Sequence, residues 1–185
     1  LHVRGGEFIA SEIEAAMDTA TLVQEACREI VELTRDRNAV LIFAAGVEHC
    51  RHVAAEISRV SGQECGVVTG DTPSAERAEL LARFRGESVQ EGLFEPKPPL
   101  KYLANCQVLT TGFDAPNIDC VVLLRPTNSP GLLVQMCGRG TRLHPSKADC
   151  TVLDYGGNIL RHGPVDAITI RDEDGARDGQ APAKE

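Results

Sequence analysis

Five short runs of apolar and β-branched residues constrain the fold of this chain most. They are Val40–Ala45, Cys65–Gly70, Leu100–Asn105, Cys120–Arg125 and Cys150–Asp154. Continuous apolar runs of this length suit strands that are covered on both faces, as in parallel sheets. Segments 47–60 and 74–84, which lie between the runs, have the periodicity of amphipathic helices. The alternation predicts an α/β fold, a parallel sheet with helices on both of its faces.

The other segments divide the chain into three parts. Residues 1–36 are predicted to be a connecting segment with one long helix over 11–36, broken near Thr19, with Ser11 as its N-cap and Glu14 completing a capping box. Residues 37–172 form the sheet domain, with an exposed, proline-rich insertion at 88–99 and a short last strand at 167–172. Residues 173–185 cannot bury apolar area and are predicted to be a disordered tail or linker. Because the chain begins with Leu1 rather than Met, we expect it to be a piece of a longer protein.

Composition narrows the class of protein. An apolar content of 42% in 185 residues can bury one substantial core. No apolar run approaches the roughly 18 residues of a membrane span, and no export signal is present, so we expect no membrane partner and a cytoplasmic location. Seven cysteines without any C-x-x-C pair and five histidines without ligand spacing predict reduced thiols and no metal site.

The stretch QMCGRGTR, residues 135–142, concentrates positive charge in a chain of net charge −8. Ser129 and Pro130 are typical of a helix start, and Gly138 falls where that helix should end. Arg139 and Arg142 are therefore predicted at a helix terminus, where two guanidinium forks could bind a terminal phosphate. Taken alone, the stretch favours the structural interpretation, a glycine-capped helix with solvated arginines.

A second stretch, LTTGFDAPNID at 109–119, follows a predicted strand. Threonine hydroxyls and glycine amides can cradle phosphates of a nucleic-acid backbone, and Asp114 can accept a hydrogen bond from a ribose hydroxyl. Taken alone, this is an ordinary junction between a strand and a loop with an Asx turn. The order and spacing of both stretches together are more specific than either one.

Together these stretches resemble motifs of the second RecA-like domain of superfamily 2 DEAD/DEAH-type helicases and translocases, most closely the bacterial RadD-like branch. VLIFAAGVEHC resembles motif IV, VVTGDTPSAER motif IVa, LTTGFDAPNID motif V and QMCGRGTR motif VI. The resemblance covers about residues 1–170. It implies a RecA-like (P-loop NTPase-type) sheet that forms the second lobe of a helicase, over residues 37–172.

The resemblance also implies roles for particular residues. Arg139 and Arg142 would be arginine fingers that reach the γ-phosphate of an ATP bound by an N-terminal RecA-like lobe, and Gln135 would open motif VI at that interface. Gly112 and Asp114 would contact the nucleotide and couple it to nucleic acid. Three further positions would touch the nucleic-acid backbone: Gly70, Arg77 and Thr111.

ATP and Mg²⁺ would be held mainly by the N-terminal lobe, because this chain contains no G-x-x-x-x-G-K-[ST] loop and no Asp-Glu metal box. The sequence therefore predicts the C-terminal lobe of an ATP-dependent DNA helicase or translocase of the bacterial cytosol or nucleoid, with DNA repair as its context and RNA as the alternative substrate. Alone, the chain is expected to be inactive. The alternatives are a restriction or excision-repair motor and, outside the enzymes, a Rossmann-like module that binds a phosphorylated ligand.

Overall fold

All five apolar runs form strands of one parallel sheet in a computed structural model that describes residues 1–89, 96–109 and 114–168. The sheet has the strand order β4-β5-β3-β6-β7, with β3 in its centre. The strands are β3 (Val40–Phe43), β4 (Cys65–Val68), β5 (Tyr102–Asn105), β6 (Cys120–Leu123) and β7 (Thr151–Asp154). The predicted α/β class is confirmed.

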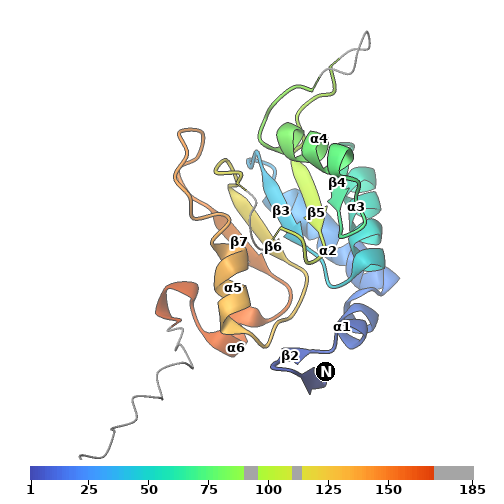
Figure 1. Ribbon diagram of the computed structural model, residues 1–185, viewed down its shortest axis with the longest axis vertical. Coiled ribbons are helices and arrows are strands. Elements are labelled where there is room, and N and C mark those ends of the chain that lie inside the picture. Colours follow the sequence, from blue (N-terminus) through green and yellow to red (C-terminus); the bar gives the residue numbers. More distant parts are fainter. Residues whose placement is uncertain (90–95, 110–113, 169–185) are drawn as a thin grey trace, which may run out of the picture.

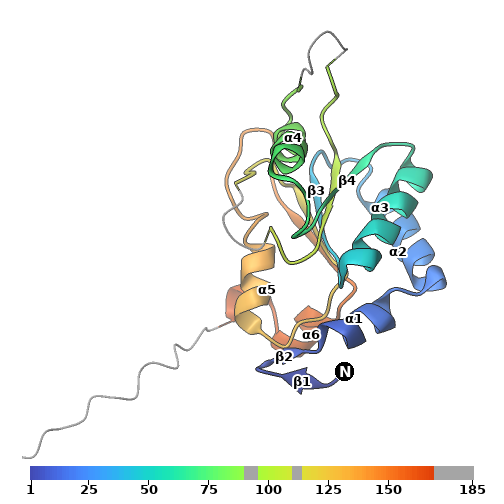
Figure 2. The same cartoon turned by 45° about the vertical axis from the view of Figure 1, so that its right-hand side comes forward.

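Helices cover both faces of the sheet, as Figures 1 and 2 show. Side chains of the central strand alternate between the faces, so Val40 and Ile42 pack on one side and Leu41 and Phe43 on the other. The first side is closed by α2 (Ala20–Leu33) and α3 (Val47–Ser61), and the second by α4 (Ser74–Phe84) and α5 (Pro130–Cys137). This two-sided burial explains why the strands read as continuous apolar runs.

The predicted opening helix is broken, as the sequence indicated. Helix α1 (Ala10–Met17) ends before Thr19, which is extended and precedes α2. The predicted capping box is wrong, because α1 begins after Ile9 without any side-chain cap. The Glu14 carboxylate instead accepts hydrogen bonds from the backbone N–H groups of Glu48 (3.0 Å) and His49 (3.3 Å) at the start of α3. Its charge suits that helix N-terminus.

Shorter elements gather at the carboxyl end of the strands. A hairpin of β1 (Val3–Arg4) and β2 (Glu7–Phe8), helix α1 and helix α6 (Asn158–His162) lie together below the sheet in Figures 1 and 2. Glu7 fastens the hairpin to the loop after β6, since its carboxylate accepts a hydrogen bond from the backbone N–H of Asn128 at 2.8 Å. The start of the chain is thus bound to the sheet domain.

Several sequence predictions lie partly outside the described residues. Residues Val165–Ala167 form a 3-10 helix rather than the start of a last strand, and 169–172 are not described. Val89 and Lys97 pair in an antiparallel bridge at the two ends of the predicted insertion, of which 90–95 are not described. Residues 173–185 are also outside the described part.

The cysteines agree with the sequence analysis. All seven are free thiols, six of them buried and Cys150 half-buried. Burial raises the pKa of the Cys50 thiol to about 12, so this side chain stays protonated and packs as a small apolar group. Along residues 1–89, 96–109 and 114–168, none of the helices has the length and apolar character that a bilayer crossing demands.

Candidate functional site

Helix α5 carries QMCGRGTR to the amino end of the sheet strands, near the start of β6. The Ser129 hydroxyl caps the helix by accepting a hydrogen bond from the backbone N–H of Leu132 at 3.2 Å, and Pro130 occupies its first turn. Leu133 and Met136 are buried against the sheet, which fixes the rotation of the helix. Gly138 ends the helix as predicted. Gln135 is exposed on α5, and Arg139, which follows the end of the helix, is half-buried.

The two arginines differ in their surroundings. Arg142 forms an ion pair with Asp114, and its side chain is 43% exposed. Arg139 is half-buried, and burial lowers the pKa of its guanidinium. The charge of Arg142 lowers the pKa of Arg139 further, whereas the charge of Asp114 opposes the shift. Two guanidinium groups therefore lie near the Asp114 carboxylate, and groups of this kind suit a polyanionic ligand.

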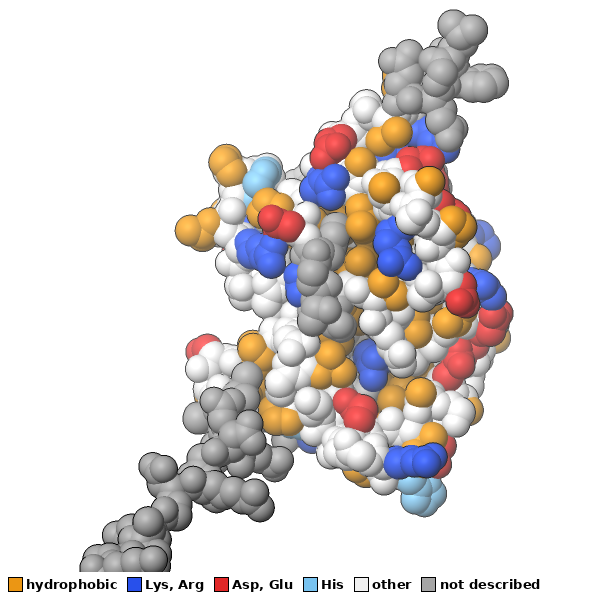
Figure 3. Space-filling model, in the orientation of Figure 1, with side chains coloured by type: hydrophobic (Ala, Val, Ile, Leu, Met, Phe, Trp, Pro, Cys, Tyr) orange, Lys and Arg blue, Asp and Glu red, His pale blue; other side chains and the backbone are white. Residues whose placement is uncertain are grey.

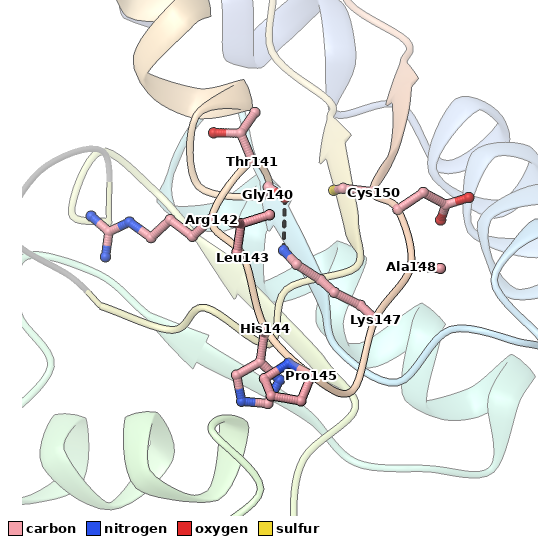
Figure 4. Close-up of a pocket in the computed structure, with 10 residues that line it drawn as sticks. Gly140, Thr141, Arg142, Leu143, His144, Pro145, Lys147, Ala148 and Cys150 are labelled. Carbon is pink, nitrogen blue, oxygen red and sulfur yellow. Dashed lines mark hydrogen bonds between the residues drawn. The ribbon is translucent and has the colours of Figure 1, made fainter.

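A cavity of about 480 Å³ opens beside Arg142, between residues 140–145 and residues 147–150. In Figure 4 the Arg142 side chain points away from the turn, while Lys147 reaches across it toward Gly140. Sequence reasoning missed Lys147, because a lysine in a turn carries no pattern that separates it from a solvated one. The hydrogen-bond partners of Lys147, the carbonyl oxygens of Ile118 and Gly140, belong to two different segments of the chain.

The described residues fit the phosphates of ATP better than its metal ion. Guanidinium groups are present at 139 and 142, and both suit phosphate oxygens. Within residues 1–89, 96–109 and 114–168, no three His, Cys, Asp or Glu side chains are grouped so that they could hold a metal ion. Any Mg²⁺ that accompanies the nucleotide would need ligands from elsewhere.

Two of the predicted nucleic-acid residues, Gly70 and Arg77, lie by the carboxyl end of β4, at the opposite end of the strands from the arginine turn. Gly70 is exposed in the loop after the carboxyl end of β4. Gly140 lies near the amino end of β6, because Lys147 donates hydrogen bonds to the carbonyl oxygens of both Gly140 and Ile118, and Ile118 precedes β6. The Arg77 guanidinium donates hydrogen bonds to the carbonyl oxygens of Thr69 (3.0 Å), Gly70 (3.4 Å) and Thr72 (3.3 Å). Arg77 thus braces the loop, and its contact with a phosphate stays a prediction. Thr111 and Gly112 lie outside the described residues.

Positive charge is dispersed over the molecular face seen in Figure 3. Lys and Arg side chains stand in separate spots among apolar and uncharged groups, and they form no continuous patch on this face. Acidic side chains are interspersed with them. A surface of this kind offers a nucleic acid few phosphate contacts, each of which would release counterions on binding.

Comparisons with known proteins agree with this geometry. The model of the family described as "Helicase conserved C-terminal domain" matches residues 22–144. A Schizosaccharomyces pombe protein whose name proposes a mitochondrial ATP-dependent helicase, irc3, is 35% identical over 164 residues, which cover 84% of this chain and 25% of that protein. The chain thus spans about a quarter of that relative's length.

Solved structures show the same fold. The Escherichia coli DEAD-box protein SrmB, solved in complex with the regulator RraA, superposes with a TM-score of 0.58 at 18% identity, covering 88% of this chain and 92% of that one. UvsW of T4 superposes with a TM-score of 0.56 at 18% identity, covering 81% of this chain and 28% of that one. Since the family model accounts for well over half of the 185 residues and these lobes share the sheet, the chain belongs to the helicase conserved C-terminal domain family.

Proposed function

We propose that this chain is the C-terminal lobe of an ATP-dependent DNA helicase or translocase, with RNA as the alternative nucleic acid. Arg139 and Arg142 would approach the γ-phosphate of an ATP whose other contacts come from an N-terminal lobe, and Gln135 would lie at that interface. The observation that carries the proposal is the pair of guanidinium groups at the end of α5, beside Asp114. Such groups stabilise the charge that develops during phosphoryl transfer.

The ion pair between Arg142 and Asp114 is suited to exchange. Both side chains are largely exposed, at 43% and 75%, so their attraction contributes only about 0–1 kcal/mol. A triphosphate carries more charge than one carboxylate and accepts the planar arginine fork at two oxygens. Arg142 would therefore turn from Asp114 to the nucleotide, and Asp114 would become free to accept a hydrogen bond from the ribose.

Nucleic acid would lie at the carboxyl end of the strands, near Gly70 and the loop that Arg77 braces. Thr111 would also contact the nucleic-acid backbone, and Gly112 and Asp114 would couple the nucleic acid to the nucleotide. Each ATP cycle would close the two lobes and change their grip on the backbone, which is a ligand-driven shift between open and closed states. A DNA motor of this kind would work in the bacterial cytosol or nucleoid, where repair is one use for it.

The alternatives to this function are a restriction or excision-repair motor and a Rossmann-like binding module. A restriction or excision-repair motor would use the same arginines and differ only in domains joined to this one. A Rossmann-like binding module would instead place its phosphate at the N-terminus of the helix after the first sheet strand. Here the Glu14 carboxylate occupies that position on α3, and a Cβ added to Gly46 would lie 2.1 Å from the Glu14 Cδ. Because the Glu14 carboxylate already occupies the N-terminus of α3, the helicase lobe is favoured over the Rossmann-like module.

The isolated chain is expected to hydrolyse ATP no faster than background, because the phosphate cradle and the metal ligands lie outside it. Phosphate release should be measured with the purified 185-residue chain, with and without DNA. The control sample is the same chain carrying Arg142→Ala, which should release phosphate at the same background rate. Turnover that needs Arg139 or Arg142 in the isolated monomer would refute the two-lobe function.

Binding of nucleic acid by the isolated chain is expected to be weak and to fall steeply with salt. Few phosphates can be neutralised by a surface of net charge −8, and each contact contributes about 0.7 to the slope of log K against log salt on a single strand. Titrations of labelled strands of unrelated sequence at several salt concentrations measure this slope. Tight binding that discriminates between sequences at physiological salt would point to a dedicated recognition module instead.

A further inference from the structure

Lys147 joins two segments that the proposed chemistry needs to hold together. Its Nζ donates hydrogen bonds to the carbonyl oxygens of Ile118 (2.6 Å) and Gly140 (2.7 Å). Ile118 closes the segment 114–118, which begins with Asp114, and Gly140 lies between Arg139 and Arg142. Figure 4 shows the bond to Gly140 spanning the turn. One ammonium group therefore sets the distance between the two backbones.

The lysine is itself held on a fixed base. Its backbone N–H donates to the His144 carbonyl oxygen at 3.2 Å, and the Ser146 N–H donates to His144 Nδ1 at 3.2 Å. Gly140 has little freedom to move, since a Cβ there would lie 2.1 Å from the Cys150 Sγ and 3.1 Å from the Val121 Cγ2. Lys147 and Gly140 are thus both held in place, so the hydrogen bonds of Lys147 define the distance between the two segments.

Stability alone does not account for this arrangement. Burial lowers the pKa of Lys147, which means that the charged ammonium is less favourable here than in water. Among the described residues, no carboxylate forms an ion pair with it, and its direct partners are two carbonyl oxygens, while the charge of Asp119 only partly opposes the effect of burial. The exposed pair of Arg142 and Asp114 is too weak to hold the two segments in register by itself. The spacing of the segments must come from the backbone ties.

We infer that Lys147 is a positioning residue for the proposed ATP hydrolysis, which fixes the segment of Arg139 and Arg142 relative to the segment of Asp114. This inference rests on the proposed function. Lys147 does not touch the nucleotide. It keeps both guanidinium groups in the orientation that the arriving phosphate requires, so that less freedom is lost when the lobes close.

The test is Lys147→Met in a protein that joins this chain to its ATP-holding lobe, because Met keeps the length of the side chain and removes the donor. A misplaced catalytic group is expected to lower kcat by about 10²-fold and to leave the KM for ATP little changed. Lys147→Arg should recover much of the loss, because its guanidinium still donates to both carbonyl oxygens. Amide hydrogen exchange should accelerate at 114–118 and 139–143 in the Met variant.

Lys101→Met is the matched control. Burial also lowers the pKa of Lys101. Its ammonium donates to one carbonyl oxygen, that of Arg35, at 3.4 Å, and in the described part of the chain it has no bond to the two segments that Lys147 joins. Lys101→Met should leave kcat unchanged, and thermal unfolding of both variants separates a loss of stability from a loss of positioning. If Lys147→Met keeps normal kcat while Arg142→Ala abolishes turnover, the positioning role is wrong and the proposed function stands. If Arg139→Ala and Arg142→Ala are also active, the proposed function fails with it.

Discussion

Replacing Arg139 or Arg142 by alanine is expected to lower kcat for ATP hydrolysis by roughly 10³–10⁵-fold in a protein that carries both lobes. Each guanidinium would stabilise charge on the transferred phosphoryl group, and such interactions raise kcat more than they tighten binding. Affinity for DNA should change much less, since Gly70 and the loop braced by Arg77 lie at the other end of the strands. Steady-state kinetics and DNA titration on the same preparations separate the two effects.

Lysine should restore little activity at either position, because an ammonium supplies the charge without the planar fork. The double alanine variant should be only slightly slower than the slower single variant, since both arginines serve one transition state. The fold should survive, because Arg142 is exposed and its partner Asp114 is 75% exposed, so that no buried charge is left unpaired. Thermal unfolding verifies this point. Near-normal kcat in both folded single variants would mean that QMCGRGTR is only the capped end of a helix and that its arginines have no role in ATP hydrolysis.

The strands were predictable from the sequence because burial on both faces requires a continuous run of apolar residues, which is a local pattern. Val40–Phe43 is apolar at every position, and all four side chains are buried in the centre of the sheet. The end of α5 was predictable for a similar reason, since Ser129, Pro130 and Gly138 act through backbone groups within a few residues of each other. Signals of this kind lie within one window of the chain.

Contacts between distant segments were not predictable. Glu14 is separated by 34 residues from Glu48, whose N–H it caps, and its spacing from Ser11 suggested a local capping box instead. Lys147 is separated by 29 residues from Ile118. Arg77 has the charge of a phosphate ligand, but its guanidinium is engaged with three carbonyl oxygens of its own loop. Tertiary packing decides which polar partner such side chains take, and no local pattern records that choice.

Gly140→Ala is expected to destabilise the lobe by about 1–3 kcal/mol and to slow ATP hydrolysis as well. The Gly140 backbone has no positive φ that would demand glycine, so the restriction is one of space. The Cys150 Sγ, 2.1 Å from the new Cβ, can rotate away, but the Cys150 Cβ at 3.2 Å and the Val121 Cγ2 at 3.1 Å belong to the packed sheet. The turn would have to move, taking Arg139 and Arg142 out of register with Asp114.

Gly131→Ala is the matched control for Gly140→Ala, because Gly131 lies in α5, the helix that leads into the turn of Gly140, and a Cβ there would meet only the Ser129 Oγ, at 3.8 Å. This substitution should stabilise the lobe by about 0.5–1 kcal/mol, since alanine loses less conformational entropy in a helix than glycine does. Cys150→Ala should relieve part of the cost of Gly140→Ala, and a double-mutant cycle followed by urea unfolding measures that coupling. Equal stability of Gly140→Ala and Gly131→Ala would show that the contact between Gly140 and Cys150 does not hold the arginine turn in place.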